Sequence, residues 1–235
     1  MKIEEMTTKE FAEAVARDPI VFLPMGATEA HGIHLPLCTD TVQPEALCAA
    51  LAEKFDGLQA PTVNYGQHSS TRNMSGTITL RFDTVRSLVG DILDSLSSQG
   101  IRKVVIVSGH AGSLHMAAIK AAAEEVVRRT ELKLMVLTDY DIAYRFPLSE
   151  KDYPDGHGGI IETSRVMAIR PDLVRSKKPK GLFEDKRFMV VPDPESCYPE
   201  GMVGDATKAS AELGKEINRF IFDNLADLIR KNFGV

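Results

Sequence analysis

Short apolar runs alternate with helical patterns along this chain, and the alternation constrains its fold more than any other feature. Residues 20–23 (IVFL) and 103–107 (KVVIV) are almost entirely apolar, as expected of strands buried on both faces. A loop and then a segment with helical spacing follow each run, at about 42–54 and 113–129. This β-α-β-α order predicts an α/β fold, a three-layer α/β/α sandwich with a mostly parallel central sheet.

The remaining pattern completes a single unit. The spacing predicts further strands at 58–63, 77–80 and 132–138. It predicts helices at 7–17, 83–98, 160–169 and 207–231. The stretches 139–158 and 172–206 are predicted to be irregular, with a short strand at 187–191 in the second. No internal repeat or low-complexity linker interrupts the order, and 235 residues suit one sizeable domain. We therefore expect one domain over residues 1–235.

Composition and charge exclude several classes of protein. The chain has 28 basic and 33 acidic residues, a net charge of −5, which argues against a nucleic-acid partner. No apolar stretch is long enough for a transmembrane helix, and the acidic N-terminus is unlike a signal peptide, so no membrane partner is expected. The three cysteines, Cys38, Cys48 and Cys197, show no paired spacing, which is typical of a reduced, cytoplasmic protein.

The loop after residues 20–23 gathers side chains that bind metals. Glu29, His31, His34 and Asp40 fall within twelve residues. In an extended segment Glu29 and His31 point to the same side, and a carboxylate beside an imidazole suits Zn²⁺, Mn²⁺ or Fe²⁺. The alternative is an ordinary loop held by hydrogen bonds, and packing of the loop is the better interpretation for His34.

Two further loops carry histidines after predicted strands. His110 follows the strand at 103–107, and His157 follows the strand at 132–138 with Glu162 five residues later. Sites in parallel sheets lie beyond the carboxyl ends of the strands, so these loops should meet. Each residue also has a structural interpretation: His110 as a polar helix cap, and Glu162 as a partner of the helix dipole. The three loops together favour a metal site.

These segments resemble the signature of the creatininase (creatinine amidohydrolase) family. Its motifs occur here in the family's order, over about residues 18–218: GATEAHGIHLP…TD at 26–40, GTITL at 76–80, GHAG at 109–112, the segment 155–164 and EGMVGD at 200–205. The resemblance implies a binuclear metal site on a three-layer α/β/α fold, usually assembled as a homohexamer.

The resemblance also implies roles for individual residues. Glu29 and His110 would hold one metal ion, His31 would hold the other, and Asp40 would bridge both. The cofactors would be two divalent ions, with zinc as the default and manganese or iron as alternatives. A hydroxide bridging the two ions would act as the nucleophile.

The last metal ligand and the proton carrier need an interpretation specific to this chain. Creatininase has a glutamate two residues after the histidine of the GHAG motif, where this chain has Gly112, so we assign Glu162 to the second metal instead. His157 matches the family histidine that handles protons or polarises the substrate carbonyl. A group with a pKa near neutrality suits that catalytic role.

Departures from the family pattern bear on the substrate. Ala111 stands where creatininase has an aromatic residue, and His68, Ser70 and Thr71 stand where the family usually has Ser, Glu and His. We therefore expect a substrate other than creatinine. His68 and Arg72 are predicted to bind an anionic group of the substrate, although Arg72 has a plain alternative as a solvated loop residue.

The sequence thus predicts a metal-dependent amidohydrolase that cleaves a C–N bond of a cyclic amide, a formamide or a similar small molecule. One alternative within the family is deformylation of a formylamino-pyrimidine ribonucleotide. An alternative from another class is a sensor that binds metal and a small ligand without hydrolysing it. A homo-oligomer is expected from the resemblance alone.

Overall fold

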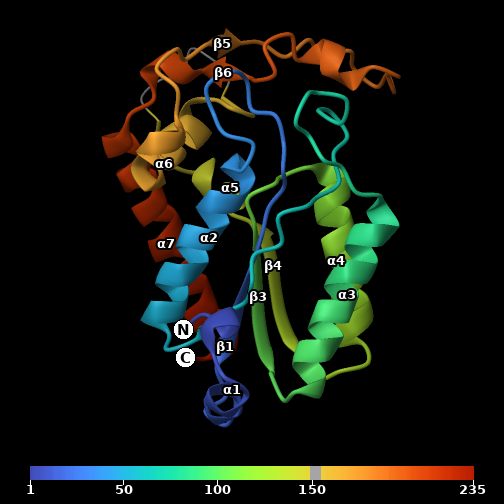
Figure 1. Cartoon of the computed structure of the whole chain (residues 1–235), viewed down its shortest axis with the longest axis vertical. Helices are drawn as coiled ribbons and strands as arrows, with labels where there is room; N and C mark the ends of the chain where they lie inside the picture. Colours follow the sequence, from blue (N-terminus) through green and yellow to red (C-terminus); the bar gives the residue numbers. More distant parts are fainter. Residues whose placement is uncertain (149–154) are drawn as a thin grey trace.

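A four-stranded sheet forms the centre of the molecule (Figure 1). The computed structural model describes residues 1–148 and 155–235. The strands occur in the order β2-β1-β3-β4 and every pairing between them is parallel, which confirms the predicted sheet: β1 (Ile20–Met25), β2 (Leu58–Gln59), β3 (Lys103–Ser108) and β4 (Lys133–Thr138). The strand expected at 58–63 is shorter, and of residues 77–80 only Thr79 forms a bridge, to Gly66.

Helices cover both faces of the sheet and complete the predicted three layers (Figure 1). One face packs against α1 (Thr8–Val15), α3 (Phe82–Ser98) and α4 (Ser113–Val127), and the other against α2 (Thr39–Lys54), α5 (Tyr140–Ala143), α6 (Ile160–Ile169) and α7 (Ala211–Phe233). The side chains of β1 alternate between the two cores, with Val21 and Leu23 in the first and Ile20 and Phe22 in the second.

Local signals set most helix boundaries. Thr7 and Glu10 form a capping box that opens α1, near the start of the helix predicted at 7–17. The helix α3 begins at Phe82, so Asp83 lies inside its first turn rather than capping it. The helix α2 begins at Thr39, three residues earlier than expected, and Pro44 therefore lies within the helix and has no N–H to donate to Asp40.

The second half of the chain differs most from expectation. The stretch predicted as irregular contains the short helix α5, and its residues 149–154 lie outside the described part of the chain. The strand predicted at 187–191 is not formed; instead β5 (Lys180–Gly181) pairs antiparallel with β6 (Gly204–Asp205). The described part of the chain also contains short 3₁₀ helices: η1 (Ile3–Glu5), η2 (Pro171–Leu173), η3 (Pro194–Cys197) and η4 (Ala206–Lys208). Over residues 1–148 and 155–235, no helix combines the length and apolar character needed to cross a membrane.

The strand order creates a crevice between two central strands. The chain leaves β1 through α2, on one face of the sheet, toward β2, and it leaves β3 through α4, on the other face, toward β4. The connections therefore diverge on opposite faces at the carboxyl ends of β1 and β3. Ligand sites in open parallel sheets lie at this kind of switch point.

Candidate metal centre

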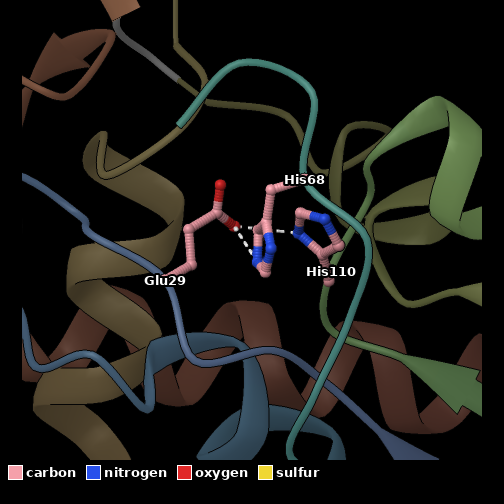
Figure 2. Close-up of side chains that lie close together, drawn as sticks. All are labelled: Glu29, His68 and His110. Atoms are coloured by element: carbon pink, nitrogen blue, oxygen red, sulfur yellow. Dashed lines mark ion pairs between the residues drawn. The ribbon is translucent and has the colours of Figure 1, made fainter. Parts of the chain in front are cut away.

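The loops that follow β1 and β3 bring an acid and a histidine into direct contact. The Glu29 Oε2 atom lies 2.9 Å from His110 Nδ1, and both side chains are almost fully buried (Figure 2). Glu29 reaches this position from the loop after β1, while His110 follows β3 by two residues. The predicted meeting of these loops at one edge of the sheet is therefore observed.

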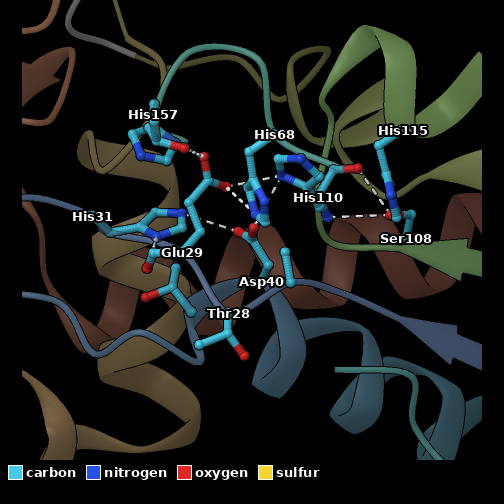
Figure 3. A network of polar contacts seen from close by, with 12 residues as sticks. Thr28, Glu29, His31, Asp40, His68, Ser108, His110, His115 and His157 are labelled. Carbon is cyan, nitrogen blue, oxygen red and sulfur yellow. Dashed lines mark hydrogen bonds and ion pairs between the residues drawn. The ribbon is translucent and has the colours of Figure 1, made fainter. Parts of the chain in front are cut away.

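Asp40, in the first turn of α2, lies between His31 and His110 (Figure 3). Its Oδ1 atom is 3.0 Å from His31 Nε2, and its Oδ2 atom is 3.1 Å from His110 Nδ1. Glu162, in the first turn of α6, places Oε2 3.5 Å from His31 Nε2. The five residues predicted as metal ligands thus form two groups that share Asp40: Glu29, Asp40 and His110 on one side, and His31, Asp40 and Glu162 on the other.

Backbone carbonyls orient both imidazoles. His110 Nε2 lies 2.9 Å from the Gln67 carbonyl oxygen, and His31 Nδ1 lies 3.1 Å from that of Glu29. Because a carbonyl only accepts, these two ring nitrogens carry the protons. The opposite nitrogens, His110 Nδ1 and His31 Nε2, then face the carboxylates, and each would present a lone pair to a metal ion once its proton is displaced. This is the orientation that metal-binding histidines adopt.

The facing atoms require a positive charge between them. His31 Nε2, Glu29 Oε2 and Asp40 Oδ2 are buried and have no hydrogen-bond partner among the described residues. A lone pair facing a carboxylate oxygen in a dry site is repulsive unless a cation or a proton lies between them. Two divalent ions, one beside Glu29 and the other beside His31, would satisfy these atoms, because such ions bind these donor types at about 2.0–2.2 Å; the residues therefore fit a metal pair.

The pKa directions of the site residues also indicate that the site requires positive charge. Burial opposes ionisation of Glu29, but the neighbouring His110 and His157 outweigh it and hold the pKa of Glu29 well below its usual range. Burial also opposes protonation of His31, yet Asp40 and Glu162 raise its pKa to about 10. In the absence of metal the site therefore retains protons that a metal ion would displace.

Two contacts hold the carboxylates, and sequence reasoning did not assign either role. The Thr71 hydroxyl donates to Glu29 Oε1, and the Gly158 amide donates to Glu162 Oε2 at 2.5 Å. Thr71 and Glu29 are separated by 42 positions. No local pattern connects residues so far apart, although the departure of this loop from the family pattern marked it as unusual.

His157 lines the pocket and lies against His31. Its ring lies on that of His31, with ring centroids 4.0 Å apart, and its Nε2 atom is 2.7 Å from the Ala30 carbonyl oxygen. The carbonyl accepts, so Nε2 carries a proton. His157 is half-buried and lines the pocket, in agreement with its predicted position beside the metal ligands.

A pocket of about 220 Å³ opens onto the carboxylates. Ala111 lines it, as the GHAG motif implies, together with the hydroxyl groups of Ser69, Ser70 and Ser113. Two tyrosines, Tyr144 and Tyr198, also line the pocket from distant segments. Neither tyrosine belongs to a motif, so neither could be predicted from the sequence as a site residue.

The other predicted residues lie away from this pocket. Arg72 is exposed and donates to the Pro192 carbonyl oxygen at 2.8 Å, so it does not reach the pocket lining as expected of a substrate contact. His68 is buried behind the lining, and burial lowers its pKa to about 4. His34 Nε2 lies 2.8 Å from Thr163 Oγ1, a contact that holds the loop to α6.

Comparison with known proteins agrees with this architecture. A family model described as creatinine amidohydrolase matches residues 4–229. Creatinine amidohydrolase of Pseudomonas putida is 31% identical over an alignment of 252 positions that covers 98% of this chain and 96% of the relative. The mycofactocin precursor peptide peptidase of Mycolicibacterium smegmatis is 29% identical, with 91% and 85% covered. A crystal structure of creatininase superposes with a TM-score of 0.84 at 30% identity, covering 99% of this chain and 97% of that one.

The fold and the paired acidic and histidine groups define a parallel α/β protein with a candidate two-metal centre at the switch point of its sheet. The chain belongs to the creatininase family of hydrolases. Similar solved structures include a manganese form of creatininase and a mutant of the zinc–zinc type. The clusters of His, Glu and Asp found here suit such ions.

Proposed function

We propose that this chain is a metal-dependent amidohydrolase that cleaves a C–N bond of a small amide. The observation that carries the proposal is the sharing of Asp40 by two groups of buried ligand atoms. Glu29, Asp40 and His110 would hold one divalent ion, and His31, Asp40 and Glu162 the other. A metal pair supplies Lewis acidity, which polarises a carbonyl and lowers the pKa of water.

Neighbouring groups orient the Glu29 carboxylate and fix the position of the proton on His157. The Thr71 hydroxyl engages Glu29 Oε1, which leaves Oε2 directed at His110. His157 keeps its proton on Nε2 by donating to Ala30, so Nδ1 is the atom that would take up a proton and deliver it to the leaving nitrogen. The position of His157 on the pocket wall supports this role.

The surroundings of Gly112 support Glu162, rather than a side chain at position 112, as the carboxylate ligand of the second metal ion. A Cβ built on Gly112 would lie 2.5 Å from His110 Nε2. A side chain at this position would therefore displace the ring that the Gln67 carbonyl orients. A ligand from α6 leaves His110 undisturbed.

The pocket favours a small, polar substrate. Its volume of about 220 Å³ lies below the lower end of ordinary ligand sites, and hydroxyl-bearing residues and two tyrosines line it together with the acidic and histidine residues. The tyrosines supply aromatic surface that Ala111 does not. An anion contact from Arg72 would suit the deformylation alternative, and in this structure the Arg72 guanidinium donates instead to the Pro192 carbonyl oxygen.

The proposal is tested with protein stripped by a chelator and reloaded with Zn²⁺ or Mn²⁺. A panel would contain creatinine, other cyclic amides, formamides and short peptides, with product release followed by mass spectrometry. We expect turnover of at least one small amide by the loaded protein, and a loss of at least about 1,000-fold in Glu29→Gln, since metal-site residues supply several kcal/mol of transition-state stabilisation.

Two results would contradict the proposal. Equal turnover by Glu29→Gln and wild type would exclude the assigned centre. Retention of a panel compound at the site through long incubation, without product, would instead support the sensor. Glu125→Gln, at an exposed ion pair with Arg86, is the matched control and should leave turnover unchanged.

We further propose a homo-oligomer, a hexamer by family resemblance. Three consecutive apolar residues, Phe188, Met189 and Val190, are at least 70% exposed, which is unusual for a monomer. Light scattering coupled to size-exclusion chromatography measures the mass directly, and a monomer at micromolar concentration would refute this assignment.

A further inference from the structure

His68 is a buried imidazole without hydrogen-bond partners. Its exposed fraction is 2%, and neither Nδ1 nor Nε2 has a partner among the described residues. A neutral imidazole presents one N–H donor and one lone pair, and leaving both unpaired in a protein interior is unfavourable. The position of this ring therefore requires a partner beyond the protein's own hydrogen bonds.

The ring faces the metal centre. His68 Nε2 lies 3.9 Å from Glu29 Oε2, and the rings of His68 and His110 have centroids 4.7 Å apart (Figure 2). One ligand atom from each of Glu29, His68 and His110 lies within 4.8 Å of the others. Glu29 Oε2 is itself without a hydrogen bond, so the unpaired atoms of two residues converge.

The backbone, and not the ring, anchors His68. Its N–H donates to Thr79 Oγ1 at 3.0 Å, and its carbonyl oxygen accepts from Gln67 Nε2 at 2.9 Å. The neighbouring Gly66 carbonyl accepts from Leu80 N at 2.7 Å. These bonds hold the loop whatever side chain stands at 68, so the fold does not by itself explain an imidazole there.

We propose that His68, through Nε2, is a further ligand of the metal ion assigned to Glu29, Asp40 and His110, and not a contact for the substrate. This inference rests on the proposed two-metal function. It makes the two positions unequal: one ion would have four protein ligands and the other, held by His31, Asp40 and Glu162, would have three. A full protein ligand set is typical of a structural ion, and an open position is typical of a catalytic one.

Two variants and a matched control test the proposal. His68→Ser removes the imidazole, and His68→Gln keeps a polar group of similar size if the serine variant does not fold. His115→Gln is the control, because His115 also packs on the His110 ring, at 4.9 Å, and has an unpaired Nε2, yet belongs to no group of ligand atoms. Thermal unfolding of the metal-free proteins verifies that each one folds.

The readouts are metal affinity, by competition with a chromophoric chelator, and the visible spectrum of the Co²⁺-loaded protein. We expect the His68 variants to lose about 100-fold or more in affinity at one of two sites, since even indirect partners of a metal ligand contribute about 10–100-fold. The Co²⁺ spectrum should change as well. His115→Gln should retain its affinity within about threefold and keep the wild-type spectrum, since it removes no metal ligand.

A wrong assignment of His68 and a wrong proposed function would give different results. If wild type binds two ions and the His68 variants bind both with unchanged affinity and spectrum, the assignment of His68 is wrong while the proposed function stands. Equal losses in His68→Ser and His115→Gln would show that packing, and not ligation, explains the effect, which also overturns the assignment. If wild type binds no divalent ion, both the assignment and the proposed function fail.

Discussion

The carbonyl oxygen of Asp40 lies so close to Gly109 that a methyl group would not fit between them. A Cβ built on Gly109 would be 2.1 Å from this oxygen, and one built on Gly26 would be 2.4 Å from it. Gly109 directly follows β3, and Gly26 directly follows β1. The two glycines therefore let the first turn of α2 enter between the strand ends, where Asp40 lies between His31 and His110.

Replacing Gly109 with alanine should displace Asp40. The overlap with backbone is too large for a side-chain adjustment, so we expect a loss of roughly 1–3 kcal/mol in the free energy of unfolding. Metal affinity should fall at least tenfold because Asp40 would leave its position between the histidines. Urea unfolding and metal titration measure the two effects.

Gly90→Ala provides the matched control, because a Cβ at this position in α3 would meet no atom within 4 Å. It should stabilise the protein by about 0.5–1 kcal/mol through helix propensity and leave metal binding unchanged. If Gly109→Ala behaved like Gly90→Ala, the close approach of α2 to β3 would not be needed for the centre.

Glu162→Gln should reduce the number of bound ions from two to one. The neutral amide is a poor metal ligand, whereas the Gly158 amide can still donate to its oxygen, so α6 should remain in place. Elemental analysis after dialysis measures the stoichiometry. Two ions bound as tightly as in wild type would remove Glu162 from the ligand set.

The metal-free protein should lose stability in mild acid, in part through His34. Burial lowers the pKa of His34 from 6.5 to about 4, so below pH 6.5 the unfolded chain takes up a proton that the folded chain refuses. Stability from this residue is therefore complete above pH 6.5 and declines as the pH falls toward 4. Urea midpoints at several pH values in the presence of a chelator follow this decline.

His34→Asn should show a smaller decline over the same pH range, whatever its stability at neutral pH. Some decline should remain, because burial also lowers the pKa values of His68 and His115, to about 4 and about 3. An identical pH dependence in the variant and wild type would mean that His34 is not held neutral in the folded state.

Arg165→Met should destabilise the protein by about 3–5 kcal/mol, because it leaves the buried carboxylate of Asp139 without its partner. Arg165 Nη2 donates to Asp139 Oδ2 at 2.5 Å, and Arg165 Nε donates to Asn218 Oδ1 at 2.9 Å. Both charged side chains are at most 1% exposed. The pair ties α6, which carries Glu162, to the end of β4.

A double-mutant cycle separates the loss of the Arg165 side chain from the cost of leaving the Asp139 charge without a partner. Adding Asp139→Asn to Arg165→Met should recover part of the loss, since the uncompensated charge is removed. Denaturant unfolding of all four proteins gives the coupling energy. Strictly additive effects would show that the two side chains do not interact in the folded protein.

The layers of the fold, and the edge of the sheet where the candidate metal centre lies, could be predicted from the sequence. Apolar runs such as 103–107 and the helical spacing after them are local patterns, and the direction of a parallel sheet then places the loops of His31, His110 and Glu162 at one edge. The resemblance to the family added the expectation that Asp40 bridges the two ions. All of these inferences use residues that are near one another in the chain or in a fixed order along it.

Tertiary structure alone decided which atoms meet. Thr71 and Glu29, Arg72 and Pro192, and Tyr198 in the pocket wall are contacts between segments that no periodicity relates. The same holds for His68, which the sequence assigned to the substrate and which lies instead behind the pocket lining, beside Glu29. Local sequence specifies helices and strands through burial and backbone preference, whereas the path of long loops depends on packing over the whole chain.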